Sequence, residues 1–194
     1  MGYAICPKSE AGDKLLKVLL AYASECWSAA SSPSQHAAVE AFSTSEHMDQ
    51  YRKSVCKLHA LCTTKLYEGL HALGLKVAKP SGAFYVYPSF QPYADQLAKI
   101  GIHTSSELSK WLVNTCGIAA LPGSAFGEDD EGLIGGRFRL RMATSYLYFA
   151  SEEEKYEKGY DLLEAAAQVK EVHLPMLEEA LSALGAAVDQ LKAI

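Results

Sequence analysis

Three arginines, Arg137, Arg139 and Arg141, alternate with apolar residues in the segment RFRLRMATS at residues 137–145. A guanidinium group is a planar fork of N–H donors that can pair with a carboxylate through two parallel hydrogen bonds. The alternation has the period of two that is typical of a strand with one buried face. From this pattern alone, the arginines are interpreted as the solvated face of an edge strand.

Two turns contain glycine and small polar residues without the chemistry of a phosphate-binding loop. They read PSGA at residues 80–83 and PGS at residues 122–124. Neither has the Gly-x-Gly-x-x-Gly pattern, or the Gly-Lys pair followed by Ser or Thr, that holds nucleotide phosphates. We interpret both as tight turns that position strands, and we assign them no catalytic role.

The cysteines and histidines are scattered along the chain without the spacing of a metal site. An odd number of cysteines and the absence of a C-x-x-C pair predict reduced, mostly buried thiols in a cytoplasmic protein. No metal ligand set is expected. The cysteines are Cys6, Cys26, Cys56, Cys62 and Cys116, and the histidines are His36, His47, His59, His71, His103 and His173.

Length and composition predict a folded, soluble protein. The chain has 194 residues, 49% of them hydrophobic, which is enough to build a core. Its formal charge of -5 argues against binding to nucleic acid, because phosphates need a basic surface. No apolar run reaches the ~18 residues of a membrane-spanning helix, so no membrane association is expected.

Apolar periodicity divides the chain into helices and short strands, which indicates an α+β fold. Besides the helix described next, helices are predicted at residues 8–24, 33–42, 105–115, 151–169 and 174–191, and strands at residues 75–78, 83–87, 117–121 and 137–142.

One predicted helix is unusually long. Thr44 or Ser45 is placed to cap it, apolar residues recur at steps of three or four, and Gly74 ends it. About 28 residues at 1.5 Å each span about 42 Å, longer than a compact domain of this size needs. We therefore expect this helix to connect two domains.

Five segments, in this order and spacing, resemble the class I and II aminotransferases, the pyridoxal phosphate (PLP) enzymes of fold type I. The resemblance covers residues 2–149 and 176–191, and it is closest to the prokaryotic-type aspartate, alanine and aromatic aminotransferases. It implies the C-terminal half of such an enzyme. The segments are GYA at residues 2–4, SPSQHAAV at 32–39, PSGAFYVYP at 80–88, PGSAFG at 122–127 and RFRLRMATS at 137–145.

The resemblance gives Arg139 a role that the pattern alone does not. In the family, the arginine of the matching V-R-L-S-x-A-T strand binds the substrate α-carboxylate with a bidentate pair of hydrogen bonds. Arg139 falls at this position, whereas Arg137 and Arg141 do not. The solvated face of an edge strand remains the alternative.

The resemblance also implies a cofactor contact at Ser32 and Ser34. In family dimers the matching loop approaches the cofactor phosphate of the neighbouring subunit, where hydroxyls and free amides can donate hydrogen bonds. The alternative is a serine-rich linker between two helices. Tyr3 belongs to a strand that runs past the cofactor in the family, although strand packing explains it equally well.

The resemblance implies that the lysine linked covalently to PLP precedes the GYA segment and is absent from this chain. Lys8, Lys14 and Lys17 do not have the family's Ser-Lys context. No catalytic residue is therefore assigned, and no PLP is expected on this chain alone. Whether the chain acts as an enzyme stays open.

The domain organisation follows from the same resemblance. Residues 1–45 are expected to be a remnant of the large PLP-binding domain, residues 46–74 the interdomain helix, and residues 75–194 the small C-terminal domain. That domain has a small mixed sheet packed with helices. An extra insertion is expected at about residues 146–175, where most relatives run directly into the last helix.

The predicted function is that of the C-terminal portion of an aminotransferase that moves an amino group from an amino acid to a 2-oxo acid. The chain would be inactive alone, cytoplasmic, and a homodimer or otherwise self-associated, because Leu15, Leu19 and Val39 lack their normal cover. The alternative is a non-catalytic, truncated interaction module that pairs with a full-length aminotransferase subunit.

Overall fold

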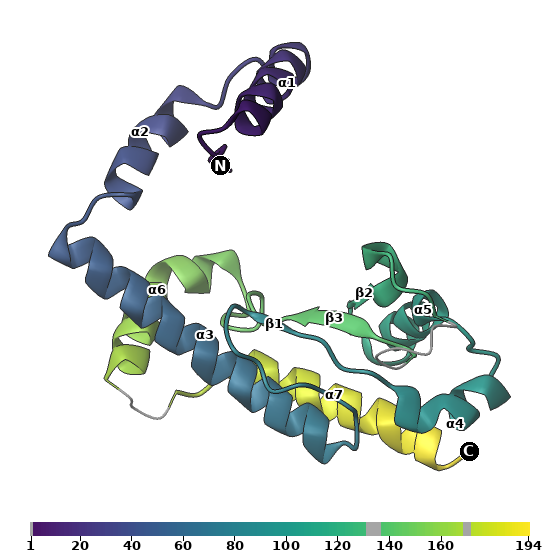
Figure 1. Ribbon diagram of the computed structural model, residues 1–194. Coiled ribbons are helices and arrows are strands. Elements are labelled where there is room, and N and C mark those ends of the chain that lie inside the picture. The colour runs from purple at the N-terminus through teal and green to yellow at the C-terminus, as the bar shows by residue number, and fades with distance from the viewer. Residues whose placement is uncertain (1, 131–136, 169–171) are drawn as a thin grey trace. The chain divides into compact units, whose positions relative to one another are not determined.

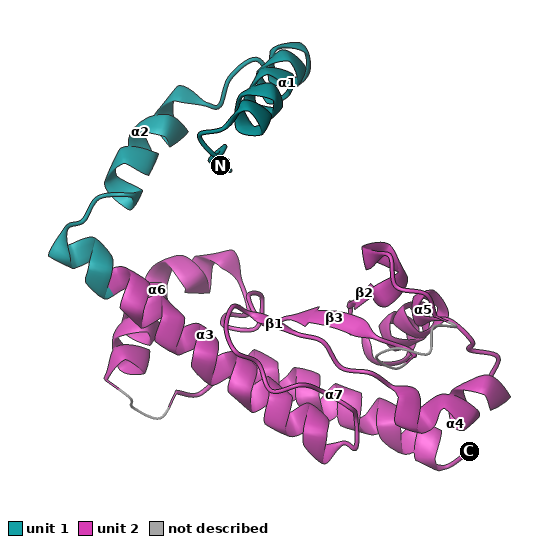
Figure 2. Ribbon diagram, viewed as in Figure 1, with its two compact units in different colours: residues 1–50 teal, residues 51–194 magenta. Residues whose placement is uncertain are grey.

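The computed structural model describes residues 2–130, 137–168 and 172–194, which form helices and one small sheet (Figure 1). The chain divides into two compact units, residues 1–50 and residues 51–194 (Figure 2). Seven α-helices, two short 3-10 helices and three strands occur in the described part. They are α1 (Glu10–Cys26), α2 (Ser32–Ala41), α3 (Glu46–Ala72), β1 (Tyr85–Val86), η1 (Gln91–Tyr93), α4 (Ala94–Lys99), α5 (Ser105–Cys116), β2 (Leu121–Pro122), η2 (Gly123–Phe126), β3 (Leu140–Ala143), α6 (Glu152–Ala167) and α7 (Pro175–Lys192).

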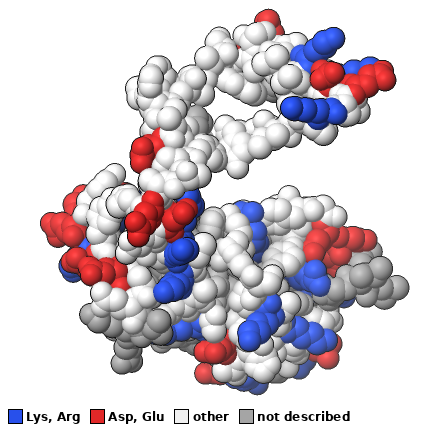
Figure 3. Space-filling view, turned by 60° about the vertical axis from the view of Figure 1, so that its left-hand side comes forward, with Lys and Arg blue, Asp and Glu red and all other residues white. Residues whose placement is uncertain are grey.

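The first unit consists of α1, α2 and the start of α3, and it has almost no core. The Ser9 side chain caps α1 by accepting a hydrogen bond from the Gly12 N–H at 3.2 Å. Gly12 is the one buried residue among residues 2–50. A side chain there would collide with the carbonyl of Pro7, since an added Cβ would lie 1.9 Å from that oxygen. Much of this unit's visible surface is uncharged, with charged side chains gathered mainly at one end (Figure 3).

The long helix predicted from the sequence is confirmed as α3, with 27 residues. The Ser45 hydroxyl accepts a hydrogen bond from the Met48 N–H at 3.3 Å, and Gly74 follows the helix with a φ of +83°. Every fourth residue from position 54 to position 70 is buried, so one stripe faces the second unit's core. These residues are Ser54, Leu58, Cys62, Leu66 and Leu70.

The sheet of the second unit has the strand order β1-β3-β2. Both pairings are antiparallel, with Val86 opposite Met142 and Pro122 opposite Leu140. The α+β class is confirmed, although the sheet is antiparallel where a mixed one was expected. Leu140 and Met142 are buried, as the alternating pattern predicted.

The core lies where α3, α5 and α7 pack with the buried face of the sheet (Figure 1). Gly69 of α3 faces Leu181 of α7 so closely that an added Cβ would lie 2.5 Å from its side chain. The chain after β3 is tied back to α3, because Lys57 and Lys65 donate hydrogen bonds to the carbonyls of Ala167 and Val172. The largest fully buried side chains include Leu70, Phe90, Leu97, Leu108, Leu112, Leu140, Leu174, Leu177, Leu184 and Leu191.

Several local predictions are corrected by the structure. The strand predicted at residues 75–78 is reduced to one bridge between Lys76 and Ser89, and the strand predicted at residues 117–121 begins only at Leu121. The helix α4 was not predicted. The thiols are not mostly buried: Cys62 is buried, Cys26 and Cys56 are exposed, and Cys6 and Cys116 are intermediate. The predicted helices at residues 105–115, 151–169 and 174–191 are confirmed within a few residues as α5, α6 and α7.

Candidate functional site

The backbone around Arg139 is held on both sides by hydrogen bonds. Arg139 forms an antiparallel bridge with Ser89, and its carbonyl accepts a hydrogen bond from the Gly123 N–H at 2.9 Å. Phe138, directly before it, is buried at 2% exposure with a φ of +56°, an uncommon conformation for a bulky residue. The buried ring of Phe138 and the two bonded neighbours fix where the Arg139 side chain leaves the backbone.

The Arg139 guanidinium is paired with a carboxylate. Its Nη1 lies 2.9 Å from Oε1 of Glu128, and the two side chains are 27% and 33% exposed. The guanidinium also lies over the ring of Tyr87, 5.6 Å from its centroid. Arg139 lines a cavity of about 360 Å³ together with Lys76, Val77, Ala78, Tyr87 and Ser89.

The hydroxyl of Tyr87 is the least satisfied polar group of this cavity. Its oxygen is buried and makes no hydrogen bond of good geometry with any described residue. Burial raises the pKa of Tyr87 to about 12, and the nearby Glu128 carboxylate adds to the rise. The hydroxyl therefore keeps its proton near neutral pH and is available as a donor.

The other two arginines have different surroundings. Arg137 donates hydrogen bonds from Nε to the carbonyl of Asp130 at 2.8 Å and from Nη2 to the carbonyl of His103 at 3.3 Å. The expectation that Arg137 shares a strand face with Arg139 is wrong, because the positive φ of Phe138 separates it from β3. In the part of the chain that the structure describes, Arg139 is the member of the three that pairs with a carboxylate.

Arg141 is held between aromatic rings. Its guanidinium carbon lies 4.5 Å from the ring centroid of Tyr85 and 4.6 Å from that of Phe126. Such cation–π contacts hold a guanidinium in place without a carboxylate. Arg141 thus resembles a structural residue, and it provides a matched control for Arg139.

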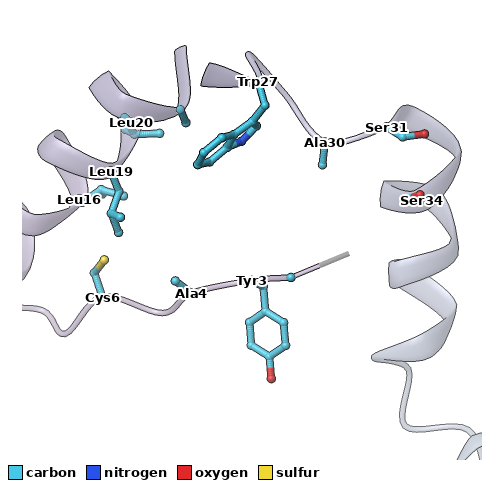
Figure 4. A pocket seen from close by; sticks show the side chains of 12 residues that line it. Tyr3, Ala4, Cys6, Leu16, Leu19, Leu20, Trp27, Ala30, Ser31 and Ser34 are labelled. Carbon is cyan, nitrogen blue, oxygen red and sulfur yellow. The ribbon is translucent and has the colours of Figure 1, made fainter. Parts of the chain in front are cut away.

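The serines predicted to contact a cofactor lie in the first unit. Ser34 is half-buried and lines a pocket of about 710 Å³ with Tyr3, Trp27 and the leucines of α1 (Figure 4). Ser32 is exposed, and it is not among the lining residues. Tyr3 contacts Phe42, with ring centroids 4.9 Å apart in an edge-to-face arrangement.

The start of α2 could hold one edge of a cofactor phosphate but not a whole cofactor. The first turn of a helix presents unpaired N–H groups, and serine hydroxyls add donors beside them. Among the described residues that line this pocket there is no Lys or Arg, so nothing there balances the phosphate charge or links covalently to PLP. The phosphate contact of Ser32 and Ser34 stays a prediction.

Sequence reasoning singled out Arg139, whose role stays a prediction, and did not anticipate that Glu128 and Tyr87 lie beside it. Glu128 directly follows the PGSAFG turn and Tyr87 lies in the PSGAFYVYP segment, two regions that were assigned only to positioning. Their contact with Arg139 depends on how three distant segments meet. In residues 2–130, 137–168 and 172–194, no cluster of His, Cys, Asp or Glu is suited to a metal ion, and no helix is both long and apolar enough to cross a membrane.

Comparison with known proteins places this chain in a family. The family model described as aminotransferase class I and II matches residues 1–146. A probable aspartate/prephenate aminotransferase of Aquifex aeolicus is 31% identical over 74% of this chain and 36% of its own length. The aspartate aminotransferase of Geobacillus stearothermophilus is 30% identical over 86% of this chain and 38% of its own length.

Solved structures agree with the fold. A mutant aspartate aminotransferase of Thermus thermophilus complexed with tryptophan has a TM-score of 0.58 and 20% identity, over 89% of this chain and 34% of that chain. A second mutant of the same enzyme has a TM-score of 0.51 and 25% identity, over 80% of this chain and 36% of that chain. The chain thus spans little more than a third of these proteins. It belongs to the PLP-dependent aminotransferase class I and II family.

Proposed function

We propose that this chain is the C-terminal part of an aminotransferase that transfers an amino group from an amino acid to a 2-oxo acid, and that Arg139 binds the substrate α-carboxylate. The observation that carries the proposal is the partly buried pair of Arg139, which lines a cavity, with the carboxylate of Glu128. The site therefore already accommodates the group that a substrate would present. Residues 1–45 would belong to the large domain, residues 46–74 to the connecting helix, and residues 75–194 to the small domain.

The role of Arg139 would be to bind and orient. PLP, when bound in the longer protein, supplies an electron sink for the chemistry at the substrate Cα. The guanidinium of Arg139 would fix a carboxylate with two parallel hydrogen bonds. Fixing the carboxylate sets the direction of the Cα–H bond, so Arg139 would contribute to rate as well as to binding. The covalent lysine and the acidic partner of the PLP ring would come from the large domain.

Ser32 and Ser34 would add donors to the cofactor phosphate of a neighbouring subunit in a homodimer. The proposal rests on their place at the N-terminal turn of α2, where backbone N–H groups lack helical partners. Their contribution would be small beside that of Arg139, because neutral hydroxyl bonds are weaker than charge-assisted ones.

The test is steady-state transamination by a longer protein in which this segment is joined to its cofactor-binding half. Arg139→Lys keeps the positive charge but loses the planar guanidinium that can form two parallel hydrogen bonds, and Arg139→Ala loses both the charge and the guanidinium. Two charge-assisted bonds imply a fall in kcat/KM of at least about a hundredfold in either variant. Arg137→Ala and Arg141→Ala should cost far less, because carbonyls hold the first and aromatic rings hold the second.

Two results would contradict this role for Arg139. Comparable losses at all three arginines would mean that the basic face is structural. A large loss at Arg141 alone would mean that the match to the family strand is out of register by two residues.

The alternative proposal is a non-catalytic module that pairs with an intact aminotransferase subunit. It is favoured by the first unit, where Leu15, Leu19 and Val39 are 49%, 39% and 74% exposed, as the sequence predicted. Mixing the chain with an intact subunit and measuring mass by light scattering separates the two proposals. A stoichiometric complex with unchanged transamination supports the module, whereas self-association without a complex opposes it.

A further inference from the structure

A second cavity in the unit formed by residues 51–194 lies apart from the one at Arg139. Its volume is about 470 Å³. Pockets that hold small molecules usually have about 300–1,000 Å³. The buried side chains of Leu66 from α3, Met142 from β3 and Leu184 from α7 line it. None of the described residues that line this cavity also lines the cavity at Arg139, so the two can take different ligands.

The residues that open this cavity to solvent include its one cation. Leu121 is 47% exposed and Tyr146 is 85% exposed, and both line the cavity together with the partly buried Arg141. Among the described lining residues, Arg141 is the one with a charged side chain. An apolar cavity with a single cation is suited to a ligand with an apolar body and one negative group, because each part of the ligand meets its complement.

Arg141 is positioned by the sheet and by two rings. It lies opposite Leu121 in the pairing of β2 with β3, and Tyr85 of β1 lies opposite Ala143, two residues further along β3. The guanidinium carbon lies 4.5 Å from the ring centroid of Tyr85 and 4.6 Å from that of Phe126. The rings attract the positive charge but offer no strong acceptor to the N–H donors of a guanidinium. Since no carboxylate of the described residues pairs with Arg141, these donors are available to the carboxylate of a ligand.

We propose that this cavity binds a small monocarboxylic acid with an apolar body. The carboxylate accepts hydrogen bonds from Arg141, and the body contacts the side chains of Leu66, Met142 and Leu184. Burial of the apolar body contributes to affinity, and the charge-assisted hydrogen bonds set the orientation of the ligand. A dicarboxylic acid fits less well, because its second charge would be buried among apolar side chains without a partner. This site is additional to the one at Arg139, and the inference does not rest on the proposed function.

The experiment measures hexanoate binding to the 194-residue chain at constant ionic strength, by NMR spectroscopy of methionine methyl groups labelled with carbon-13. The chain has four methionines. Met142 lines the cavity, whereas Met48 and Met176 do not. Hexanoate should therefore shift the Met142 signal, identified with Met142→Leu, in a saturable way and leave the other two in place. The uncharged 1-hexanol should bind about tenfold more weakly, because it lacks the charge-assisted hydrogen bonds.

Arg141→Gln tests the cation. It removes the charge and keeps a polar side chain, so hexanoate should bind about tenfold more weakly, no better than 1-hexanol. Lys110→Gln makes the same change of net charge at an exposed position of α5, and it should leave the affinity unchanged.

Ala180→Leu tests the cavity with Arg141 intact. The larger side chain projects from α7 into the space that the apolar body occupies, so both probes should bind at least about tenfold more weakly. Ala186→Leu makes the same change at an exposed position of the same helix, and it should leave both affinities unchanged. Unfolding midpoints and far-UV circular dichroism of each variant establish that the fold is retained.

Saturable binding at Met142 that weakens in both Arg141→Gln and Ala180→Leu supports the proposal. It is overturned by the absence of a saturable shift of Met142, or by hexanoate binding that is as tight in Arg141→Gln as in the unaltered chain. A shift of Met48 in place of Met142 also overturns it, because the probe would then bind to the exposed apolar surface of the first unit. Binding that is lost in Arg139→Ala and retained in Arg141→Gln assigns the carboxylate to the other cavity and overturns the proposal as well.

Discussion

Residues 2–50 and residues 51–194 both contain amphipathic helices, and their burial differs sharply. Of all the residues in α1 and α2, Gly12 of α1 is the one that is buried. In the second unit, α3, α5 and α7 each bury an apolar stripe against a shared core. The large apolar residues exposed in the first unit are Tyr3, Ile5, Leu15, Leu16, Val18, Leu19, Leu20, Tyr22, Trp27, Val39 and Phe42.

This difference shows that the apolar face of a helix predicts that the face is covered, but does not identify the part of the protein that covers it. Most of the stability of a helix in a protein comes from packing its apolar face, and isolated helices of fewer than ~12–15 residues are marginal in water. The 10-residue α2 has no buried residue at all. The first unit therefore has the surface expected of a domain fragment, which supports the proposal that it belongs to a larger domain.

The largest expected contrast comes from deleting side chains in the two units. Leu140→Ala removes a fully buried side chain from the central strand β3 and should cost about 2–5 kcal/mol of unfolding free energy. Leu20→Ala in α1, where the side chain is 61% exposed, should change it by less than about 0.5 kcal/mol.

Each unit has one tryptophan, which makes this measurement selective. With Trp27→Phe as the common background, denaturant unfolding followed by Trp111 fluorescence reports the second unit alone. Equal destabilisation by Leu140→Ala and Leu20→Ala would show that α1 is packed in solution, and the contrast between the units would be lost.

A smaller contrast comes from two helix caps with the same geometry. The Thr104 hydroxyl accepts a hydrogen bond from the Glu107 N–H at 3.2 Å, and the Ser9 hydroxyl accepts one from the Gly12 N–H at 3.2 Å. Thr104→Ala should lower the stability of the second unit by about 1 kcal/mol, because α5 unfolds together with its core. Ser9→Ala should leave that unit unchanged and reduce only the helix content of α1. If Ser9→Ala lowers the stability reported by Trp111, the units are coupled.

Most helices could be predicted from the sequence because local signals define them. The signals of α3 lie within a few residues of one another: the apolar periodicity, the cap at Ser45 and the glycine that follows the helix. The strands were harder. Their pairing at Lys76 and Ser89, or at Leu121 and Arg141, depends on segments brought together only by tertiary packing.

The candidate site divides in the same way. Arg139 could be singled out because a family strand motif surrounds it, and its role stays a prediction. Its neighbours Glu128 and Tyr87 were not anticipated, because the first follows a left-handed Gly127 and the second follows β1, which pairs with β3. The positive φ of Phe138 separates Arg137 from the strand. It could not be predicted from the sequence, because a bulky aromatic residue rarely adopts a positive φ.

A partly buried polar network in the second unit gives the smallest expected effect. Nδ1 of His59 lies 2.6 Å from the hydroxyl of Tyr148, which lies 3.4 Å from Oγ1 of Thr144. Burial lowers the pKa of His59 below its usual 6.5, so the unfolded chain binds a proton at a higher pH than the folded one does. The stabilising contribution is fully present above pH 6.5 and is lost as the pH falls from there through the lower pKa of the folded state.

His59→Gln should remove this part of the pH dependence, because glutamine can accept a hydrogen bond from Tyr148 but does not titrate. The measurement is the difference in unfolding free energy between about pH 7.5 and about pH 5.5, followed by Trp111 fluorescence. His36→Gln, in the exposed α2 of the first unit, is the matched control and should leave the difference unchanged, since that unit is outside the transition being observed. If the change in unfolding free energy between the two pH values is the same in His59→Gln as in the unaltered chain, the folded protein protonates His59 as readily as the unfolded chain does. A changed difference in His36→Gln would show instead that the first unit contributes to the folding of the second.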